Sequence, residues 1–258
     1  VLPSSLSGEA KQLGQALADT LEMLRQRNQE LEASNRELKQ FSYIASHDLQ
    51  EPIRTVTSFA TNIERDYAQL MDDTGRRSLQ FILESCYRMQ ALIHGLLEFS
   101  RLGVEARPER VELESLVRGA EADLADAISS AAGTVHVGSL PTLTVYAVEL
   151  RMLFQNLIAN AIKFRRDEVP PIVWVAARRE GDGWLITVAD NGIGVPEKHR
   201  EKVFLIFQRL HNRSEYEGTG IGLAHCRKVV DMHHGRIWVE TSDAGGARFC
   251  VFLKEVRA

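Results

Sequence analysis

The chain has 258 residues, of which 44% are hydrophobic and 26% are charged, and its formal net charge is −4. This length favours about two domains, and the composition excludes a largely disordered chain. The negative charge argues against a general binder of nucleic acid or of anionic membranes. No apolar run approaches the roughly 18 residues that a membrane-spanning helix needs.

The cysteines and the first residue give two further expectations. Cys86, Cys226 and Cys250 are scattered and lack the spacing of metal ligands. We therefore expect reduced, buried thiols in a cytoplasmic protein. Because the chain begins at Val1 rather than at Met, we expect a fragment whose upstream part is missing.

Residues from about 9 to 40 carry a heptad pattern. Positions alternately four and three residues apart form one seam, which consists of Leu17, Leu21, Leu24, Asn28, Leu31, Asn35 and Leu38. This spacing is typical of a two-stranded parallel coiled coil, in which paired asparagines fix the register. The alternative is one amphipathic helix that packs on its own domain; the narrow, long seam favours the dimer.

The helical pattern continues through His47 to about Tyr67. Its apolar stripe is Ala45, Leu49, Val56, Ala60 and Ile63. His47 lies off this stripe and should project toward solvent, with Asp48 beside it. A carboxylate can hold one ring nitrogen as N–H and leave the other as a nucleophile, although such a pair alone is also typical of an ordinary surface histidine. Pro52 removes a backbone donor, so we expect a kink there.

A second helix is predicted after the segment 71–75, where Asp or Thr should cap and Gly75 is free to take a positive φ. Its apolar stripe is Leu79, Ile82, Cys86, Met89, Ile93, Leu96 and Leu97. Two antiparallel helices cannot bury both apolar faces alone, whereas two copies can do so in a four-helix bundle. The N-terminal seam supplies the symmetry axis of this dimer.

The remainder predicts a mixed α/β unit, because only four of the 18 glycines precede Gly103. A linker follows Gly103 and contains Pro108. Strands are expected at 111–113, 134–137, 143–146, 172–178, 184–189, 236–241 and 247–254, with a tight hairpin at 180–183. Helices are expected at 114–132, 148–165, 203–210 and 223–233.

The helix at 148–165 is apolar except for one polar face. Asn156, Asn160 and Lys163 share that face at i, i+4 and i+7. Amide oxygens can bind a hydrated Mg²⁺, and a lysine can bind phosphate. Two satisfied core asparagines would be the structural alternative.

Three glycine-containing or aromatic segments follow. Asp190, Gly192 and Gly194 end a strand, where the carboxylate could accept from an exocyclic amine such as that of adenine and the glycines allow a flat ligand to approach. The same residues are equally compatible with a plain turn. Residues 204–207, Arg209 and the polar stretch 211–217 predict either a mobile lid or an ordinary surface loop.

The last segment opens a helix. Gly218, Gly220 and Gly222 leave backbone N–H groups open to an anion at the helix N-terminus. The spacing is not that of a dinucleotide fingerprint, and no Lys-Ser/Thr follows as in a phosphate-binding loop.

Together, five segments resemble the motifs of sensor histidine kinases, over nearly the whole chain from about residue 40. Residues 47–52 resemble the H box, 156–164 the N box, 190–194 the first glycine box, 204–207 the F box and 218–222 the second glycine box. The amino-acid sequences of segments 47–52 and 160–165 are similar to those of kinases that follow phytochrome and PAS sensor domains.

The resemblance implies a role for each matching residue. His47 would accept the γ-phosphoryl group of ATP, and Asp48 would orient its ring and help to remove its proton. Asn160 would bind Mg²⁺, with support from Asn156. The ATP-binding residues would be Asn156, Asn160, Lys163, Asp190, Gly192, Gly194, Phe207, Arg209, Gly218, Thr219, Gly220, Gly222 and Leu223.

The resemblance also separates kinase activity from hydrolysis. The related gyrase, mismatch-repair and chaperone ATPases carry Glu where this chain has Asn156, and an amide cannot activate water as a general base. Transfer to histidine is thus favoured over the alternative, an ATP-hydrolysing conformational switch; a non-catalytic nucleotide-binding scaffold is a further alternative. Many relatives carry Thr or Asn where this chain has Glu51, which puts phosphatase activity in doubt.

The predicted architecture has three parts. These are a coiled-coil signalling helix (1–40), a dimerising helical hairpin that carries His47 (41–103), and an α/β sandwich ATP-binding domain of the histidine kinase, gyrase and chaperone type (108–258). The resemblance implies a homodimer in the cytoplasm, ATP and Mg²⁺ as cofactors, an upstream sensor, and a response-regulator receiver domain as partner. We expect no nucleic-acid partner and no direct membrane contact of this fragment.

Overall fold

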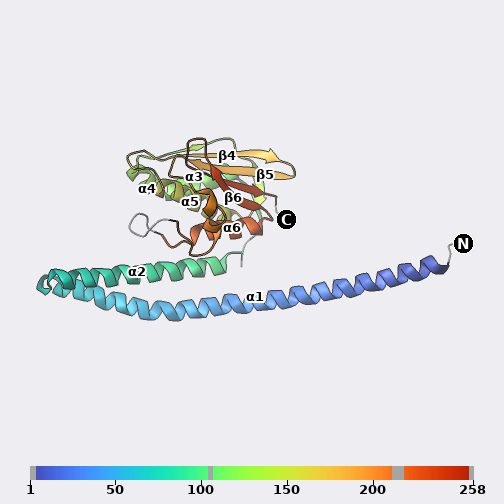
Figure 1. The fold of residues 1–258 in the computed structure, drawn as a ribbon, viewed down its shortest axis with the longest axis horizontal. Helices are drawn as coiled ribbons and strands as arrows, with labels where there is room; N and C mark the ends of the chain where they lie inside the picture. Colours follow the sequence, from blue (N-terminus) through green and yellow to red (C-terminus); the bar gives the residue numbers. More distant parts are fainter. Residues whose placement is uncertain (1–3, 104–106, 211–217, 256–258) are drawn as a thin grey trace.

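The computed structural model describes residues 4–103, 107–210 and 218–255; the side chains of residues 4–13, 31–32, 34–45, 47 and 101 also lie outside the described set. Two long helices come first and an α/β unit follows (Figure 1). The helices are α1 (Ser4–Tyr67) and α2 (Asp73–Arg101), joined through the short 3-10 turn η1 (Ala68–Leu70). No described helix is long and apolar enough to cross a membrane.

The helix α1 is continuous through Pro52 and gently curved (Figure 1). The chain thus stays helical through Pro52, where a kink was predicted, and the helix is not interrupted there. At the start of α2, Oδ1 of Asp72 accepts a hydrogen bond from the backbone N–H of Gly75 at 2.7 Å, which confirms the Asp cap. Gly75 does not adopt the positive φ that is open to it, because it lies inside the first turn of α2.

The two helices pack antiparallel over part of their length. Nε2 of Gln90 donates to Oγ1 of Thr57 at 3.3 Å and marks the register. Apart from Leu96 and Leu97, which are half-buried, and Ala45, whose side chain lies outside the described set, the predicted stripes divide into two sets. One set is buried between the helices: Ala60, Leu79, Cys86 and Ile93. The other set stays exposed: Leu49, Val56, Ile63, Ile82 and Met89. One hairpin alone thus leaves an apolar face in contact with water.

The α/β unit contains seven strands and four α-helices within the described residues. Its elements are β1 (Glu109–Glu112), α3 (Leu113–Asp123), α4 (Ala125–Ser130), β2 (Thr134–Val137), β3 (Thr142–Val145), α5 (Ala147–Lys163), β4 (Ile172–Glu180), β5 (Gly183–Asp190), the 3-10 turns η2 (Glu197–His199) and η3 (Lys202–Phe204), α6 (Gly222–Met232), β6 (Arg236–Thr241) and β7 (Ala247–Leu253).

The main sheet has the order β2-β4-β5-β7-β6, and β1 pairs separately with β3. Only the β2–β4 pair is parallel. Strand residues alternate: Val173 and Val175 are buried on the helix side, whereas Trp174 and Ala176 line a shallow hollow on the other face. The predicted hairpin between β4 and β5 is confirmed, with Gly181 at φ 58°.

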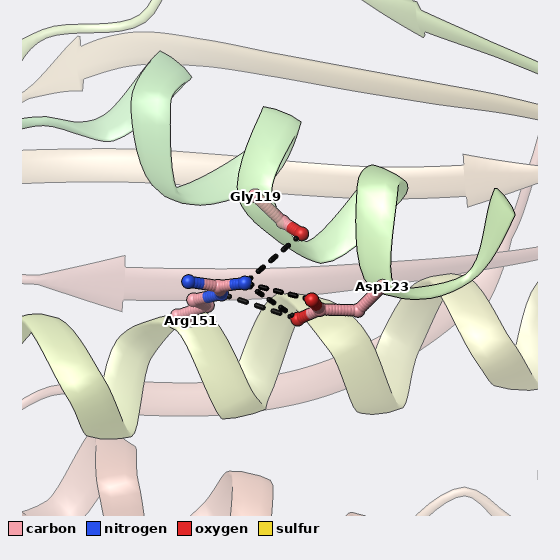
Figure 2. A network of polar contacts seen from close by, with 3 residues as sticks. All are labelled: Gly119, Asp123 and Arg151. Carbon is pink, nitrogen blue, oxygen red and sulfur yellow. Dashed lines mark hydrogen bonds and ion pairs between the residues drawn. The ribbon is translucent and has the colours of Figure 1, made fainter.

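The core lies between this sheet and the helices. Phe154, Leu150 and Leu157 of α5 are fully buried in it. Figure 2 shows how α3 and α5 are joined at the surface: Arg151 Nη2 lies 2.8 Å from both carboxylate oxygens of Asp123 and donates to the Gly119 carbonyl at 3.3 Å. Because the pair is partly exposed, it stabilises the packing by only about 1 kcal/mol or less.

Two predicted helices differ from the observed ones. The helix predicted at 114–132 is interrupted at Leu124 and forms α3 and α4. The helix predicted at 203–210 is wrong: only η3 forms, and Phe207 has φ 64°. The three cysteines are free and buried, as predicted.

Candidate functional site

A cavity of about 250 Å³ opens between α5, the end of β5, the segment after η3 and the start of α6. Most residues predicted to bind a nucleotide line its wall: Asn156, Asn160, Lys163, Asp190, Gly194, Arg209, Gly218, Thr219, Gly220, Gly222 and Leu223. Gly192 and Phe207 are not among the lining residues; Gly192 is buried behind the wall and Phe207 is 52% exposed.

The polar face of α5 supplies one side of the cavity. Nδ2 of Asn156 donates to the Met152 carbonyl of its own helix at 2.9 Å, so the amide oxygen points away from that bond. This oxygen lies against Gly222, where a Cβ atom would come within 2.4 Å of it. A side chain at this position would therefore displace the amide group of Asn156.

Lys163 lies one turn further along α5. Its Nζ atom is 4.5 Å from the centroid of the Phe164 ring and close to Gly218, where a Cβ atom would come within 2.7 Å. Gly218 has φ 143°, a conformation that favours glycine. Lys163, Gly218 and the first residue of α6, Gly222, all line the cavity, and an ammonium group together with helix N–H groups suits a phosphate chain.

Asp190 is the buried acid of the site, with 6% of its surface exposed. Its Oδ1 atom accepts hydrogen bonds from the N–H groups of Gly192 at 2.8 Å and Ala247 at 2.9 Å. Burial raises the pKa of Asp190, and these two N–H groups and the charge of Arg166 oppose that rise. Because both bonds end on Oδ1, Oδ2 is the oxygen that can accept from a ligand.

The loop around Asp190 is closely packed. A Cβ atom at Gly246 would lie 2.2 Å from Oδ1 of Asp190 and 2.3 Å from its carbonyl oxygen. Arg166 donates from Nε to the Gly192 carbonyl at 3.1 Å, and Oγ of Ser242 donates to the Asp190 carbonyl at 2.5 Å. The carboxylate is held in one position by groups from both flanking segments.

The segment after η3 forms the open rim of the cavity. Phe207 donates its N–H to the Gly220 carbonyl at 2.9 Å, and both residues have positive φ values, 64° and 75°. The rim is thereby tied to the glycine segment before α6. The predicted lid continues through 211–217, which lies outside the described residues.

The predicted phosphoacceptor lies on a different element. His47 belongs to α1, and its side chain lies outside the described residues; Asp48 beside it is exposed. The nearby faces of α1 and α2 form a shallow hollow lined by Gln50, Glu51, Arg54, Tyr87, Gln90, Ala91 and His94. The acceptor segment and the cavity are therefore built from separate parts of the fold.

Comparison with known families connects the two parts. Residues 37–105 match the "His Kinase A (phospho-acceptor) domain", and residues 146–257 match the "Histidine kinase-, DNA gyrase B-, and HSP90-like ATPase". The chain carries the catalytic core of a sensor histidine kinase. The resemblance predicted from the five segments and the predicted fold class are confirmed, and the second match supports ATP binding by the cavity domain.

Curated relatives of this kinase core include phytochromes. "Cyanobacterial phytochrome A" of Nostoc sp. is 42% identical over 85% of the chain, and "Phytochrome-like protein Cph1" of Synechocystis sp. is 39% identical over 88%. The chain covers only 29% and 30% of these relatives. Among solved structures, full-length ShkA in complex with AMPPNP matches with a TM-score of 0.63 at 23% identity. The match covers 85% of this chain and 46% of the ShkA chain, and it shows that the two share a fold.

The sequence did not reveal every residue of the kinase core's cavity. Its apolar wall adds Phe164, Val195, Val203, Leu210, Ala247 and Phe249, together with Gln208. These apolar residues have the same pattern as core residues, so no sequence signal separates them. The bond from Arg166 to Gly192 could have been suspected, because the 160–166 segment combines the N box with two arginines.

Proposed function

We propose that this protein autophosphorylates His47 with ATP and passes the phosphoryl group to an aspartate on a response-regulator receiver domain. One observation supports this most directly. The cavity combines a buried acid, a lysine and a glycine-opened helix N-terminus in a chain that also has a phosphoacceptor domain. The buried acid suits an adenine amine, the lysine suits phosphates, and the helix N-terminus suits the end of a triphosphate.

ATP would be held from both ends of the cavity. Oδ2 of Asp190 would accept from the adenine amine, while Lys163 and the first N–H groups of α6 would bind phosphate oxygens. Gly194, Gly218, Thr219, Gly220, Gly222 and Leu223 would shape the surrounding wall. Arg209 lies on the rim, where its positive charge favours an anionic ligand. Phe207 would act through the rim rather than by contact.

The residues present also fit a Mg²⁺ ion. No cluster of three or more acidic, histidine or cysteine side chains that could hold a metal occurs among the described residues. The described residues therefore do not suit a metal ion that is bound by protein ligands alone. One amide oxygen, on Asn160, suits a Mg²⁺ ion whose other ligands are substrate phosphates and water. Bound there, Mg²⁺ would neutralise phosphate charge.

Transfer to histidine is favoured over hydrolysis by Asn156. Its amide has no basic form at neutral pH, and its Nδ2 is already engaged with Met152. A general base for water is therefore missing at this position. On α1, the His47 imidazole would attack the γ-phosphorus, and the bond from that phosphorus to the β,γ-bridging oxygen would break to release ADP. Asp48 would hold the ring and help to remove its proton.

We further propose a parallel homodimer. The exposed apolar residues of α1 and α2 would form a four-helix bundle, and the seam leucines Leu17, Leu21 and Leu24, which are exposed in one copy, would pair along the coiled coil. A cytoplasmic location and an upstream sensor are proposed from the phytochrome relatives, which are longer than this chain.

Incubation with γ-labelled ATP tests the proposal. We expect acid-labile label on the protein, which His47→Gln should abolish. His94→Gln is the matched control, because His94 is an exposed histidine on the neighbouring helix and should keep its label. Release of free phosphate without protein-bound label would instead support the ATPase alternative. Label that persists in His47→Gln would refute His47 as the acceptor.

A further inference from the structure

The C-terminal half of α2 packs directly against α6 of the ATP-binding unit (Figure 1). The rings of Phe99 and His225 stack with centroids 5.5 Å apart and an interplanar angle of 6°. Gly95 lies one turn earlier, and the absence of a side chain there admits Ile221. Leu102, next to the end of α2, is buried in the core of the α/β unit.

Lys228 adds a polar connection to this contact. Its Nζ atom donates to the Phe99 carbonyl and lies 4.4 Å from the centroid of the Phe99 ring. The last four carbonyls of a helix have no partner inside the helix, and a cation near them is also favoured by the helix dipole. Lys228 of α6 therefore caps the C-terminal end of α2.

His225 is the titratable group inside the contact. It is 5% exposed, and its Nε2 atom is buried without a hydrogen-bond partner among the described residues. Glu98 on α2 and Lys228 on α6 are the charged groups that act on it, and His94 pairs with Glu98 at 3.2 Å. Burial lowers the pKa of His225; Glu98 and the Gly95 backbone oppose this, and Lys228 adds to it.

The contact between α2 and α6 lies at about the same height along the α1–α2 hairpin as the predicted phosphoacceptor His47. Phe99 is nine residues beyond Gln90 and His47 is ten residues before Thr57, and Gln90 and Thr57 are hydrogen-bonded across the antiparallel helices. At about 1.5 Å per residue, Phe99 and His47 are at nearly the same height. Ile221, opposite Gly95, directly precedes the helix that begins at the cavity. Seating α6 on α2 thus sets the position of the ATP cavity along the hairpin.

We propose that this contact is a proton-released latch, in which neutral His225 stacked on Phe99 holds the α/β unit on α2 and protonated His225 releases it. A charged imidazole at this position would lose its hydration and would be repelled by the Lys228 ammonium; Glu98 and the Gly95 backbone favour the charge, but burial outweighs them. After release, water solvates it. The inference concerns docking alone and stands whether or not the proposed phosphotransfer does.

The sign of the pH effect follows from linkage. The docked form holds the His225 proton less tightly than the released form, whose pKa is about 6.5. His225 therefore adds little pH dependence to docking above about 6.5. As the pH falls below that value, the docking equilibrium constant should fall by up to about tenfold per pH unit.

A disulfide trap measures docking in the full chain. A Cβ atom on Gly95 would lie 3.7 Å from Cβ of Ile221, within the usual range for a disulfide. The pair Gly95→Cys with Ile221→Cys should cross-link within one chain when α6 is seated. The native thiols are buried and compete little. The matched control adds His225→Phe, which keeps an aromatic ring but cannot titrate.

We compare the cross-linked fraction of the two proteins between pH 8 and pH 5.5, because their ratio cancels the pH dependence of thiol oxidation. The ratio of the protein that keeps His225 to the His225→Phe control should fall across this range, by at most about tenfold. A constant ratio, or no intramolecular cross-link at any pH, would overturn the latch. If the control does not fold, the NMR titration of His225 decides: its midpoint should be lower in the locked chain than in the reduced chain, and equal midpoints would also overturn it.

Discussion

Replacing Asp190 by Asn tests the assignment of the adenine-side acceptor. The two N–H groups that bind Oδ1 at 2.8 and 2.9 Å can bind an amide oxygen equally well, so the loop should keep its shape. The change instead turns Oδ2, the oxygen that we propose accepts from adenine, into an NH₂ donor. A hydrogen bond to a charged acceptor contributes about 1.5–3 kcal/mol, so ATP affinity should fall roughly 10- to 150-fold.

The same substitution should leave stability unchanged or slightly increased. Burial raises the pKa of Asp190, so the folded protein bears the cost of a buried charge at neutral pH, and the favourable contribution of this group appears only as the pH falls toward its raised pKa. Titration calorimetry with ATP and thermal melting give the two quantities. Asp243→Asn is the matched control, because Asp243 is an exposed carboxylate in the β6–β7 turn. Unchanged ATP affinity in Asp190→Asn would refute the reasoning, and so would a strongly lowered melting temperature.

Three further predictions concern the cavity and the core. Gly246→Ala should abolish ATP binding and lower the melting temperature, because its Cβ atom would overlap Oδ1 and the main-chain carbonyl oxygen of Asp190. Lowering the pH below about 6.5 should destabilise the α/β unit in part through His233: burial lowers its pKa, and its neutral ring binds the Tyr146 N–H and the Val229 carbonyl. Arg151→Ala should cost about 1 kcal/mol or less in the free energy of unfolding, measured by urea denaturation.

Each of these has a control. Gly138→Ala should be tolerated, because the nearest atom to its Cβ lies 3.5 Å away. The acid sensitivity of unfolding should be smaller in His233→Gln, and an unchanged pH profile in that variant would contradict the role of His233. Arg151→Lys should lose the paired hydrogen bonds to Asp123 but keep the charge; a cost above about 2 kcal/mol for Arg151→Ala would show that the pair is more than a surface contact.

The sequence was most informative where one local rule determines the structure. The β4–β5 hairpin follows from glycines at a two-residue turn, and the polar face of α5 follows from helical spacing. The helix predicted at 203–210 failed because Leu205, Ile206 and Phe207 form an apolar run like that of a buried helix, yet all three are exposed. The bond from Phe207 to the Gly220 carbonyl, far along the chain, determines the local backbone instead.

Periodicity also cannot identify the partner of an apolar stripe. On α1, Ala60 packs inside the hairpin while Val56 and Ile63, of the same predicted stripe, face outward. An apolar stripe predicts that one face of a helix is buried, but it does not specify whether the covering surface belongs to the same chain or to a second copy. Only the hairpin register separates these two sets, and that register depends on side chains such as Gln90 and Thr57, which no apolar pattern includes.

The same limit explains why the α2–α6 contact escaped sequence reasoning. Phe99 and His225 lie 126 positions apart on two helices whose own patterns are satisfied without each other. A histidine on an otherwise apolar helix face predicts a core residue, and His233, with both ring nitrogens bonded, fits that description. His225 differs because one ring nitrogen is buried without a partner among the described residues, which costs free energy in any state that keeps it there. Protonation would place a charge on this buried ring, so the seated arrangement is the one that acid should displace.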